Sequence, residues 1–146
     1  MGSTMDSAFK HAANMAQYLN RCNSTYIIQI ALKEMGVSSG YEGFHYAKQS
    51  IRILCEKPTA TLANGVYLEA GALYDPPADE IQVEQAIRTA IKKAWDERDK
   101  EIWECYFPVG KTGRTKCPSN KDFLMAVADF IVLWQGFCEE VHYAKQ

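Results

Sequence analysis

DEIQVEQAIRTAIKKAW, residues 79–95, is the segment that decides the fold. Its apolar side chains recur at intervals of three and four residues, which is the spacing of one face of an α-helix. They are Val83, Ala86, Ile87, Ala90, Ile91, Ala94 and Trp95. Asp79 followed three residues later by Gln82 is a capping pair for this helix, although Asp75 before Pro76 is a rival start. The segment therefore predicts a long helix with one wholly apolar face.

The rest of the chain carries the same helical spacing, and few stretches alternate as a β-strand does. Gly36 is expected to end one helix in the left-handed conformation, and Gly40 and Gly43 are expected to flank a turn. Ser119 with Asp122 is expected to cap the last helix. We expect an all-α globular domain of six or seven helices, at about residues 6–22, 26–35, 44–55, 61–74 (interrupted by Gly65 and Gly71), 79–95, 102–107 and from 119 onward.

The composition is that of an ordinary soluble protein. The 146 residues are 47% hydrophobic and 23% charged, with a formal net charge of −2. No apolar run approaches the ~20 residues of a membrane helix, and no leader resembles a signal peptide. We therefore expect a cytoplasmic protein that has no membrane partner. The five cysteines form no C-x-x-C pair, which predicts free, reduced and mostly buried thiols rather than disulfides or a zinc site.

No motif in the sequence points to catalysis. Gly110-Lys111-Thr112 resembles the end of a phosphate-binding loop, but the glycine required five positions earlier is Cys105. The three histidines are far apart and have no carboxylate at metal-ligand spacing. A cysteine–histidine pair stays open, but nothing recommends a particular one. We predict no enzyme activity, no catalytic residue, no metal and no cofactor.

Residues 61–95 combine a modest helix, a turn rich in polar residues and proline, and a longer helix, which is the order of a helix-turn-helix. Opposite its apolar stripe, the longer helix carries side chains that are suited to a DNA major groove. Glutamine can bond to adenine and arginine can bond to guanine, while isoleucine can cover the methyl group of thymine. They are Ile81, Gln85, Arg88, Thr89 and Lys92, with Gln82 and Lys93 on the flank. Pattern alone does not separate a DNA-reading face from one that merely meets water.

The glycine-rich segment 108–118 and the residues after it are cationic. Four basic residues occur with no acidic residue before Asp122, namely Lys111, Arg114, Lys116 and Lys121. Such a loop beside a reading helix can neutralise phosphates of the DNA backbone. Charge runs are also common on loops that are merely solvated.

Several blocks of the sequence resemble a known family. They are Glu34-Met35-Gly36-Val37, Gly43-Phe44-His45-Tyr46, the helix 83–95, Pro118-Ser119-Asn120-Lys121-Asp122-Phe123 and Met125-Ala126-Val127-Ala128-Asp129. In order and spacing, over about residues 26–130, they resemble the C-terminal effector domain of the stage-zero sporulation response regulator. The resemblance implies a six-helix, all-α domain over residues 23–146, after an N-terminal extension at 1–22. It also implies a reading helix that begins near Asp79 and transcription control through double-stranded DNA.

The chain departs from the family's pattern on the reading helix. Glu84 and Arg88 keep the family's residues, but Gln82 and Gln85 stand where the family has arginines, and Thr89 stands where it has a histidine. The turn before the helix is about two residues longer. These changes imply a target DNA sequence that differs from the family's own.

The departures also bear on two further properties of the family, the contact with RNA polymerase and control by phosphorylation. The segment that contacts RNA polymerase in the family falls near residues 107–111 and keeps only Phe107. Only about 25 residues precede the resemblance, which is too few for the family's receiver domain. Control by phosphorylation is therefore expected to be absent.

Two functions from different classes stay open. The first is a stand-alone, sequence-specific DNA-binding transcription regulator that binds DNA as a homodimer, with RNA polymerase as a further partner implied by the family. Its contacts would be Gln82, Glu84, Gln85, Arg88, Thr89, Lys92, Lys111, Arg114 and Lys116. The second is a protein-interaction module, an antagonist or adaptor, that kept the fold and lost DNA binding. The net charge and the acidic residues Asp75, Asp79, Glu80 and Glu84 favour the second.

Overall fold

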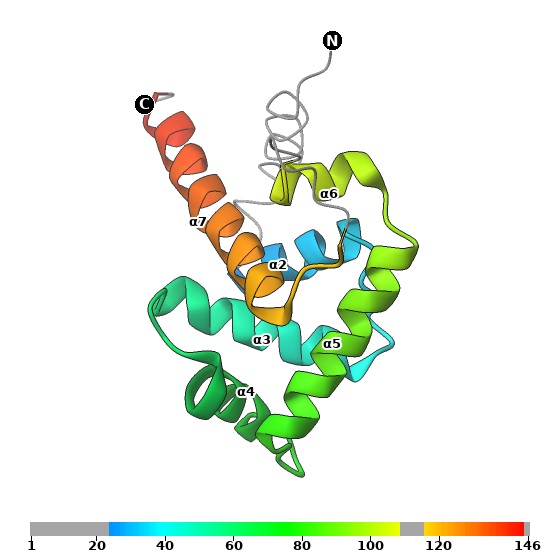
Figure 1. Ribbon diagram of the computed structural model, residues 1–146. Helices are drawn as coiled ribbons and strands as arrows, with labels where there is room; N and C mark the ends of the chain where they lie inside the picture. Colours follow the sequence, from blue (N-terminus) through cyan, green and yellow to red (C-terminus); the bar gives the residue numbers. More distant parts are fainter. Residues whose placement is uncertain (1–23, 109–115, 145–146) are drawn as a thin grey trace.

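The computed structural model of the chain describes residues 24–108 and 116–144 (Figure 1). Within these residues there are six α-helices and no β-strand, which confirms the predicted all-α fold. The predicted helix at residues 6–22 lies outside the described residues. The elements in chain order are α2 (Ser24–Glu34), α3 (Glu42–Glu56), the turn η1 (Leu62–Val66), α4 (Tyr67–Ala72), α5 (Glu80–Asp96), α6 (Lys100–Tyr106) and α7 (Asn120–Ala144).

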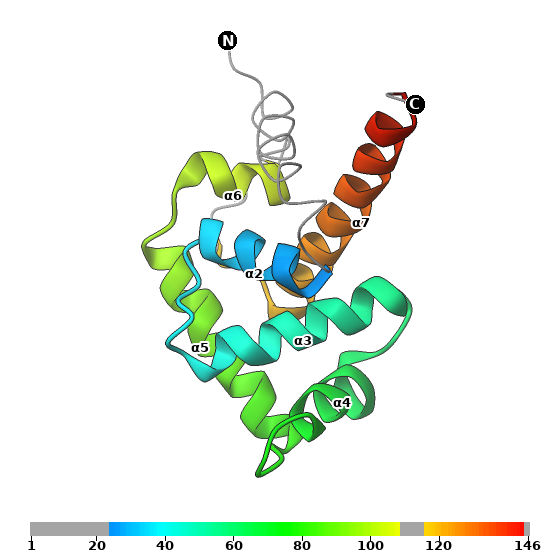
Figure 2. The same cartoon turned by 180° about the vertical axis from the view of Figure 1, so that it is seen from behind.

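Helix α3 occupies the centre of the domain. It contacts α2, α4, α5 and α7, and Figure 2 shows it running between α2 on one side and α4 on the other. Removing the apolar side chains of these helices from water is the main force that holds them together. The largest fully buried side chains are Trp134, Phe44, Phe123, Ile27, Ile28, Leu32, Met35, Ile51, Ile53, Leu54 and Ile87.

Gly36 ends α2 as predicted. Its φ is +86°, in the left-handed region that a side chain disfavours. The N–H of Gly36 donates to the carbonyl of Lys33 at 3.0 Å, and the N–H of Val37 donates to that of Leu32 at 2.9 Å. These two bonds form a Schellman motif, which satisfies carbonyls at the end of the helix.

Gly43 comes just before residue 44, where the helix was predicted to start. In the structure it lies in the first turn of α3. A Cβ atom at this position would lie 2.1 Å from the carbonyl oxygen of Ala86 and 2.8 Å from the Cβ of Ala90, both on α5. Non-bonded contacts this short are essentially never found for a Cβ atom. The absence of a side chain at Gly43 therefore allows the backbones of α3 and α5 to approach each other.

Trp103 on α6 lies at the centre of an aromatic cluster near the C-terminal end of α5. Its indole N–H donates to the carbonyl of Met35 at 2.9 Å. Its ring contacts those of Trp95, Phe107 and Phe123, with centroid separations of 5.6, 5.8 and 5.6 Å. Trp103 thereby joins α6 to α5, to α7 and to the end of α2.

The weak helix predicted at residues 61–74 is shorter in the structure. Regular α-helix begins only at Tyr67, because Asn64 adopts φ +60° and Ala63 is extended. Asparagine tolerates this left-handed conformation better than most residues. The Asn64 N–H also donates to the carboxylate of Glu80, which ties η1 to the first turn of α5. The interruption therefore falls at Ala63 and Asn64 rather than at the predicted Gly65, and the second predicted interruption, Gly71, lies within α4.

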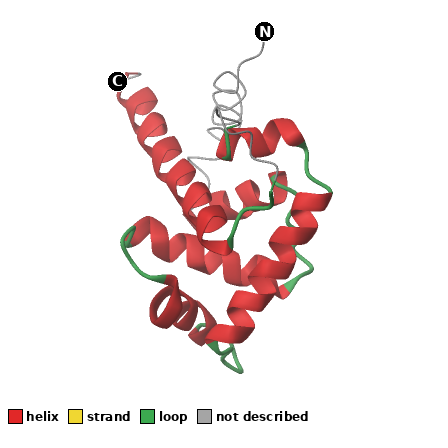
Figure 3. Cartoon of the chain, viewed as in Figure 1, coloured by secondary structure: helices red, strands yellow, loops and turns green. Residues whose placement is uncertain are grey.

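A loop at residues 73–79 joins α4 to α5, and Figure 3 shows it as the green connection between the two helices. The Ala78 N–H donates to the carbonyl of Gly71 at 3.1 Å, and a Cβ at Gly71 would lie 2.3 Å from the Ala78 carbonyl oxygen. The hydroxyl of Tyr74 donates to the carbonyl of His45 on α3 at 3.1 Å. The loop is thus held both to α4 and to α3.

Helix α5 begins after Asp79, which resolves the two predicted starts in favour of this residue. The Gln82 N–H donates to Asp79 Oδ1 at 2.8 Å, and the Asp79 N–H donates to Gln82 Oε1 at 3.0 Å. This reciprocal capping box satisfies two N–H groups at the start of the helix.

Replacing Asp79 with alanine should lower the free energy of unfolding by about 1 kcal/mol, because α5 loses its N-cap acceptor. The change is measured as a shift of the urea midpoint. Asp75→Ala is the matched control, since Asp75 is exposed and lies outside the capping box. Equal midpoint shifts for the two variants would contradict the assigned cap.

Helix α7 closes the domain. The Asp122 N–H donates to Ser119 Oγ at 3.1 Å, which confirms the predicted cap. The first part of the helix buries Phe123, Val127 and Trp134, and Figure 1 shows its C-terminal part extending away from α3 and α5. None of the described helices has both the length and the apolar composition that a membrane crossing requires.

Candidate nucleic-acid interface

Helix α5 presents two sharply different faces. Its buried residues are Val83, Ile87, Ala90, Ile91 and Ala94, which agree with the predicted apolar stripe. On the opposite face Gln85, Thr89 and Lys92 are exposed, and Ile81 is 65% exposed. The described part of the chain therefore leaves the centre of the predicted reading face uncovered.

Two of the predicted contacts also make hydrogen bonds inside α5. The side chain of Gln82 is engaged in the capping box with Asp79. The hydroxyl of Thr89 donates to the carbonyl of Gln85 at 3.0 Å, one turn earlier in the helix. Both residues are exposed, but their side chains are held against the helix rather than free to extend from it.

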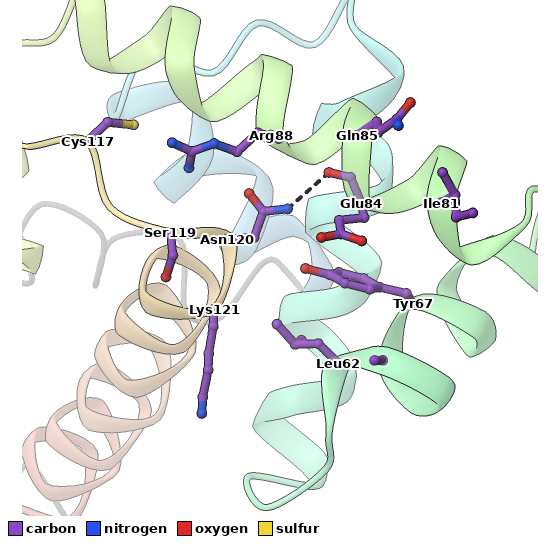
Figure 4. A pocket seen from close by; sticks show the side chains of 11 residues that line it. Leu62, Tyr67, Ile81, Glu84, Gln85, Arg88, Cys117, Ser119, Asn120 and Lys121 are labelled. Atoms are coloured by element: carbon purple, nitrogen blue, oxygen red, sulfur yellow. Dashed lines mark hydrogen bonds between the residues drawn. The ribbon is translucent and has the colours of Figure 1, made fainter.

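Arg88 and Glu84 lie on the edge of the face that approaches α7. Arg88 is half-buried, and its Nη1 donates to the carbonyl of Pro118 at 2.6 Å. The backbone carbonyl of Glu84 accepts a 3.0 Å hydrogen bond from Nδ2 of Asn120, the first residue of α7 (Figure 4). Sequence reasoning missed the role of Asn120, because it is separated from Glu84 by 36 positions.

A groove of about 700 Å³ lies beside this edge, between α5, η1 and the start of α7. Figure 4 shows side chains from all of these segments around it. Its walls are mixed, with apolar groups from η1 and α5 and charged groups from α5 and α7. The lining residues are Leu62, Ala63, Tyr67, Ile81, Glu84, Gln85, Arg88, Cys117, Ser119, Asn120 and Lys121.

Three described basic side chains lie in or near the groove. Arg88 and Lys121 line it, and Lys116 is exposed just before the start of α7 in the chain. The predicted phosphate contacts Lys111 and Arg114 lie outside the described residues. The basic side chains that are described beside α5 are thus on the side of the helix that faces α7.

Two of the four acidic residues that favour an interaction module have structural partners. Asp79 caps α5, and the carboxylate of Glu80 accepts the N–H of Asn64. Asp75 and Glu84 are exposed, and Glu84 borders the groove. The acidic character of this region is therefore explained in part by the way α5 begins.

Burial raises the pKa of thiol and phenol groups in and near the core. Burial, together with Glu56 and Asp129, raises the pKa of Cys55 to about 11, so its thiol is protonated at neutral pH. Burial also raises the pKa of Tyr67, while a hydrogen bond with the Asn120 side chain acts in the opposite direction. In the part of the chain that the structure describes, no three histidine, cysteine or carboxylate side chains gather as they would around a metal ion.

A short helix and a capped longer helix joined by the loop at residues 73–79, within an all-α core, have the order of a helix-turn-helix. Residues 27–131 match the model of the family described as Sporulation initiation factor Spo0A C terminal. The chain belongs to this family. The matched range runs from α2 to the middle of α7 and includes every residue that lines the groove.

Proposed function

We propose that the chain is a sequence-specific DNA-binding transcription regulator whose helix α5 enters the major groove. The observation that carries the proposal is the uncovered outer face of α5, where Gln85, Thr89 and Lys92 are exposed within a helix-turn-helix. Membership of a family of sporulation-regulator effector domains supports the same function.

The exposed side chains suit different parts of DNA. Gln85 can bond to the edge of a base, and Ile81 can cover the methyl group of thymine. Lys92 and Lys116 are suited to phosphates, which position a protein without specifying sequence. Lys111 and Arg114 remain predicted phosphate contacts. Gln82 and Glu84 belong to the margins of the proposed interface, and the Gln82 side chain and the Glu84 carbonyl also stabilise the fold. Thr89 belongs to the outer face, where its hydroxyl donates to the carbonyl of Gln85.

We further propose that two copies bind adjacent half-sites, because a single helix reads only a few base pairs. A contact with RNA polymerase stays a prediction from the resemblance. Phe107, the family residue that the chain keeps in the polymerase-contacting segment, stacks on Trp103 and Phe123. Packing is therefore sufficient to explain why phenylalanine occurs at this position.

Fluorescence anisotropy with a random-sequence duplex pool at low salt tests the proposal. Binding should appear at micromolar protein and weaken steeply as salt is added, because phosphate contacts release counterions. If the protein bound no DNA under these conditions, the proposal would fail. Recovery of a partner protein that binds equally well at high salt would then support an interaction module.

Replacing Gln85 with alanine should lower discrimination at one base position about tenfold, because a bidentate contact to a base edge is lost. The preferred sequence is first selected from a random duplex library, and single-base variants are then compared by anisotropy. Gln29→Ala on α2, outside the helix-turn-helix, should leave the profile unchanged. Identical profiles for wild type and Gln85→Ala would remove Gln85 from the interface.

Replacing Lys116 with glutamine should weaken binding to all DNA sequences alike, because one phosphate contact is lost. The slope of log affinity against log salt should fall by about one. A salt titration by anisotropy measures this slope, with Lys33→Gln on α2 as the matched loss of charge. An unchanged slope would place Lys116 away from the DNA backbone.

A further inference from the structure

Two hydrogen bonds fasten α5 to the start of α7, and they run in opposite directions. Arg88 on α5 donates to the backbone carbonyl of Pro118 at 2.6 Å. Asn120 on α7 donates to the backbone carbonyl of Glu84 at 3.0 Å. Figure 4 shows the Asn120 side chain between Glu84 and Arg88. We refer to Arg88, Asn120 and the two carbonyls that accept from them as the α5–α7 clamp.

The two bonds act on the same part of each segment. Glu84 and Arg88 are one helical turn apart, and Pro118 and Asn120 are two residues apart. The clamp therefore holds a single turn of α5 against residues 118–120. The Arg88 bond is short and charge-assisted, which makes it stronger than a bond between neutral groups. The Pro118 carbonyl also accepts from the thiol of Cys117 at 3.6 Å.

Asn120 is an unusual residue to bury. It is only 8% exposed, and its Oδ1 atom is buried with no hydrogen-bond partner among the described residues. An unpaired buried acceptor is unfavourable, and such groups in native structures call for an explanation. Asn120 is buried here despite this cost, and its Nδ2 donates to the carbonyl of Glu84, which joins the first turn of α7 to the proposed reading helix.

We infer that Arg88 and Asn120 are positioning residues, which set the place of the basic residues Lys116 and Lys121 relative to the reading face of α5. The inference rests on the proposed function. In this arrangement the clamp aligns the phosphate-binding residues with the base-reading residues, so that both meet one DNA duplex at the same time.

This role differs from the base contact that the sequence predicts for Arg88. A base-reading arginine specifies guanine, so its loss relaxes preference at one position of the DNA site. A positioning arginine leaves the preferred sequence unchanged and lowers affinity for every sequence. The two roles therefore give different results in the same binding experiment.

The test compares the full chain with its Arg88→Ala and Asn120→Ala variants in two measurements. The first is the sequence preference and affinity for duplexes selected from a random library. We expect an unchanged preferred sequence with affinity lowered about tenfold in each variant. The second is amide hydrogen exchange without DNA, where residues 116–122 should exchange about tenfold faster in each variant.

Two further variants sharpen the result. Lys92→Ala removes a cation one turn along α5 and should weaken DNA binding without altering exchange at residues 116–122. Arg88→Lys keeps a cationic donor and should recover most of the protection. If Asn120→Ala does not fold, Asn120→Asp replaces it, because aspartate keeps the shape and lacks the donor.

A change of base preference in Arg88→Ala, or unchanged exchange at residues 116–122 in either alanine variant, would overturn the inference. If the wild type binds no DNA, the proposed function fails, whereas the exchange measurement still decides whether the clamp holds the start of α7. The two failures are therefore distinguishable.

Discussion

Gly43→Ala is expected to destabilise the domain by about 3 kcal/mol, a large effect for the addition of one methyl group. The added Cβ would lie 2.1 Å from the carbonyl oxygen and 2.7 Å from the carbonyl carbon of Ala86. Both atoms belong to the backbone of α5, so no side-chain rotation can relieve the contact. Alanine is the better helix former by about 1 kcal/mol, which offsets only part of this cost.

Urea unfolding followed by circular dichroism measures the effect. Gly40→Ala is the matched control, because a Cβ there meets only Ser38 Oγ at 3.6 Å, an ordinary van der Waals distance. We expect a large midpoint shift for Gly43→Ala and a small one for Gly40→Ala. Similar midpoints would mean that α3 and α5 can separate at little cost.

Trp103→Ala is expected to lower the free energy of unfolding by about 4 kcal/mol, the range typical of a buried aromatic residue replaced by alanine. Trp103 is 3% exposed and contacts three other aromatic rings. Its loss leaves both a cavity and an unpaired Met35 carbonyl.

Trp103→Phe separates these two contributions. Phenylalanine keeps most of the ring and loses the N–H donor, so the expected cost is about 2 kcal/mol, mainly from the unpaired carbonyl. Thermal and urea unfolding should rank the variants as wild type, Trp103→Phe and Trp103→Ala in order of falling stability. A phenylalanine variant as unstable as the alanine one would assign nearly all of the effect to the hydrogen bond.

The parts of the fold that depend on neighbouring residues could be predicted from the sequence. Helix α5 was expected from its apolar period and its capping pair, and Asp79 and Gln82 form that cap. Gly36 was expected in the left-handed conformation for a similarly local reason. The conformation of Asn64 escaped prediction because it depends on a bond to Glu80, which is 16 positions away. Gly43 was expected beside a turn, but its role is a close approach to another helix.

The candidate site could be predicted only in outline. The exposed face with Gln85, Thr89 and Lys92 follows from the helical period alone. The engagement of Arg88 with Pro118 does not, because these residues are 30 positions apart and no local pattern brings them together. Contacts between a side chain and a distant backbone carbonyl leave little trace in a single sequence, since any residue type can supply the carbonyl.

The central place of α3 determines whether the helix-turn-helix could keep its structure outside the domain. A peptide covering only residues 61–96 would contain α4, the loop and α5, yet it would lack the partner against which α4 and α5 both pack. Its apolar stripe would meet water, and the angle between its two helices would no longer be enforced. The smallest part of the chain expected to keep the helix-turn-helix folded is therefore the whole helical domain rather than the motif alone.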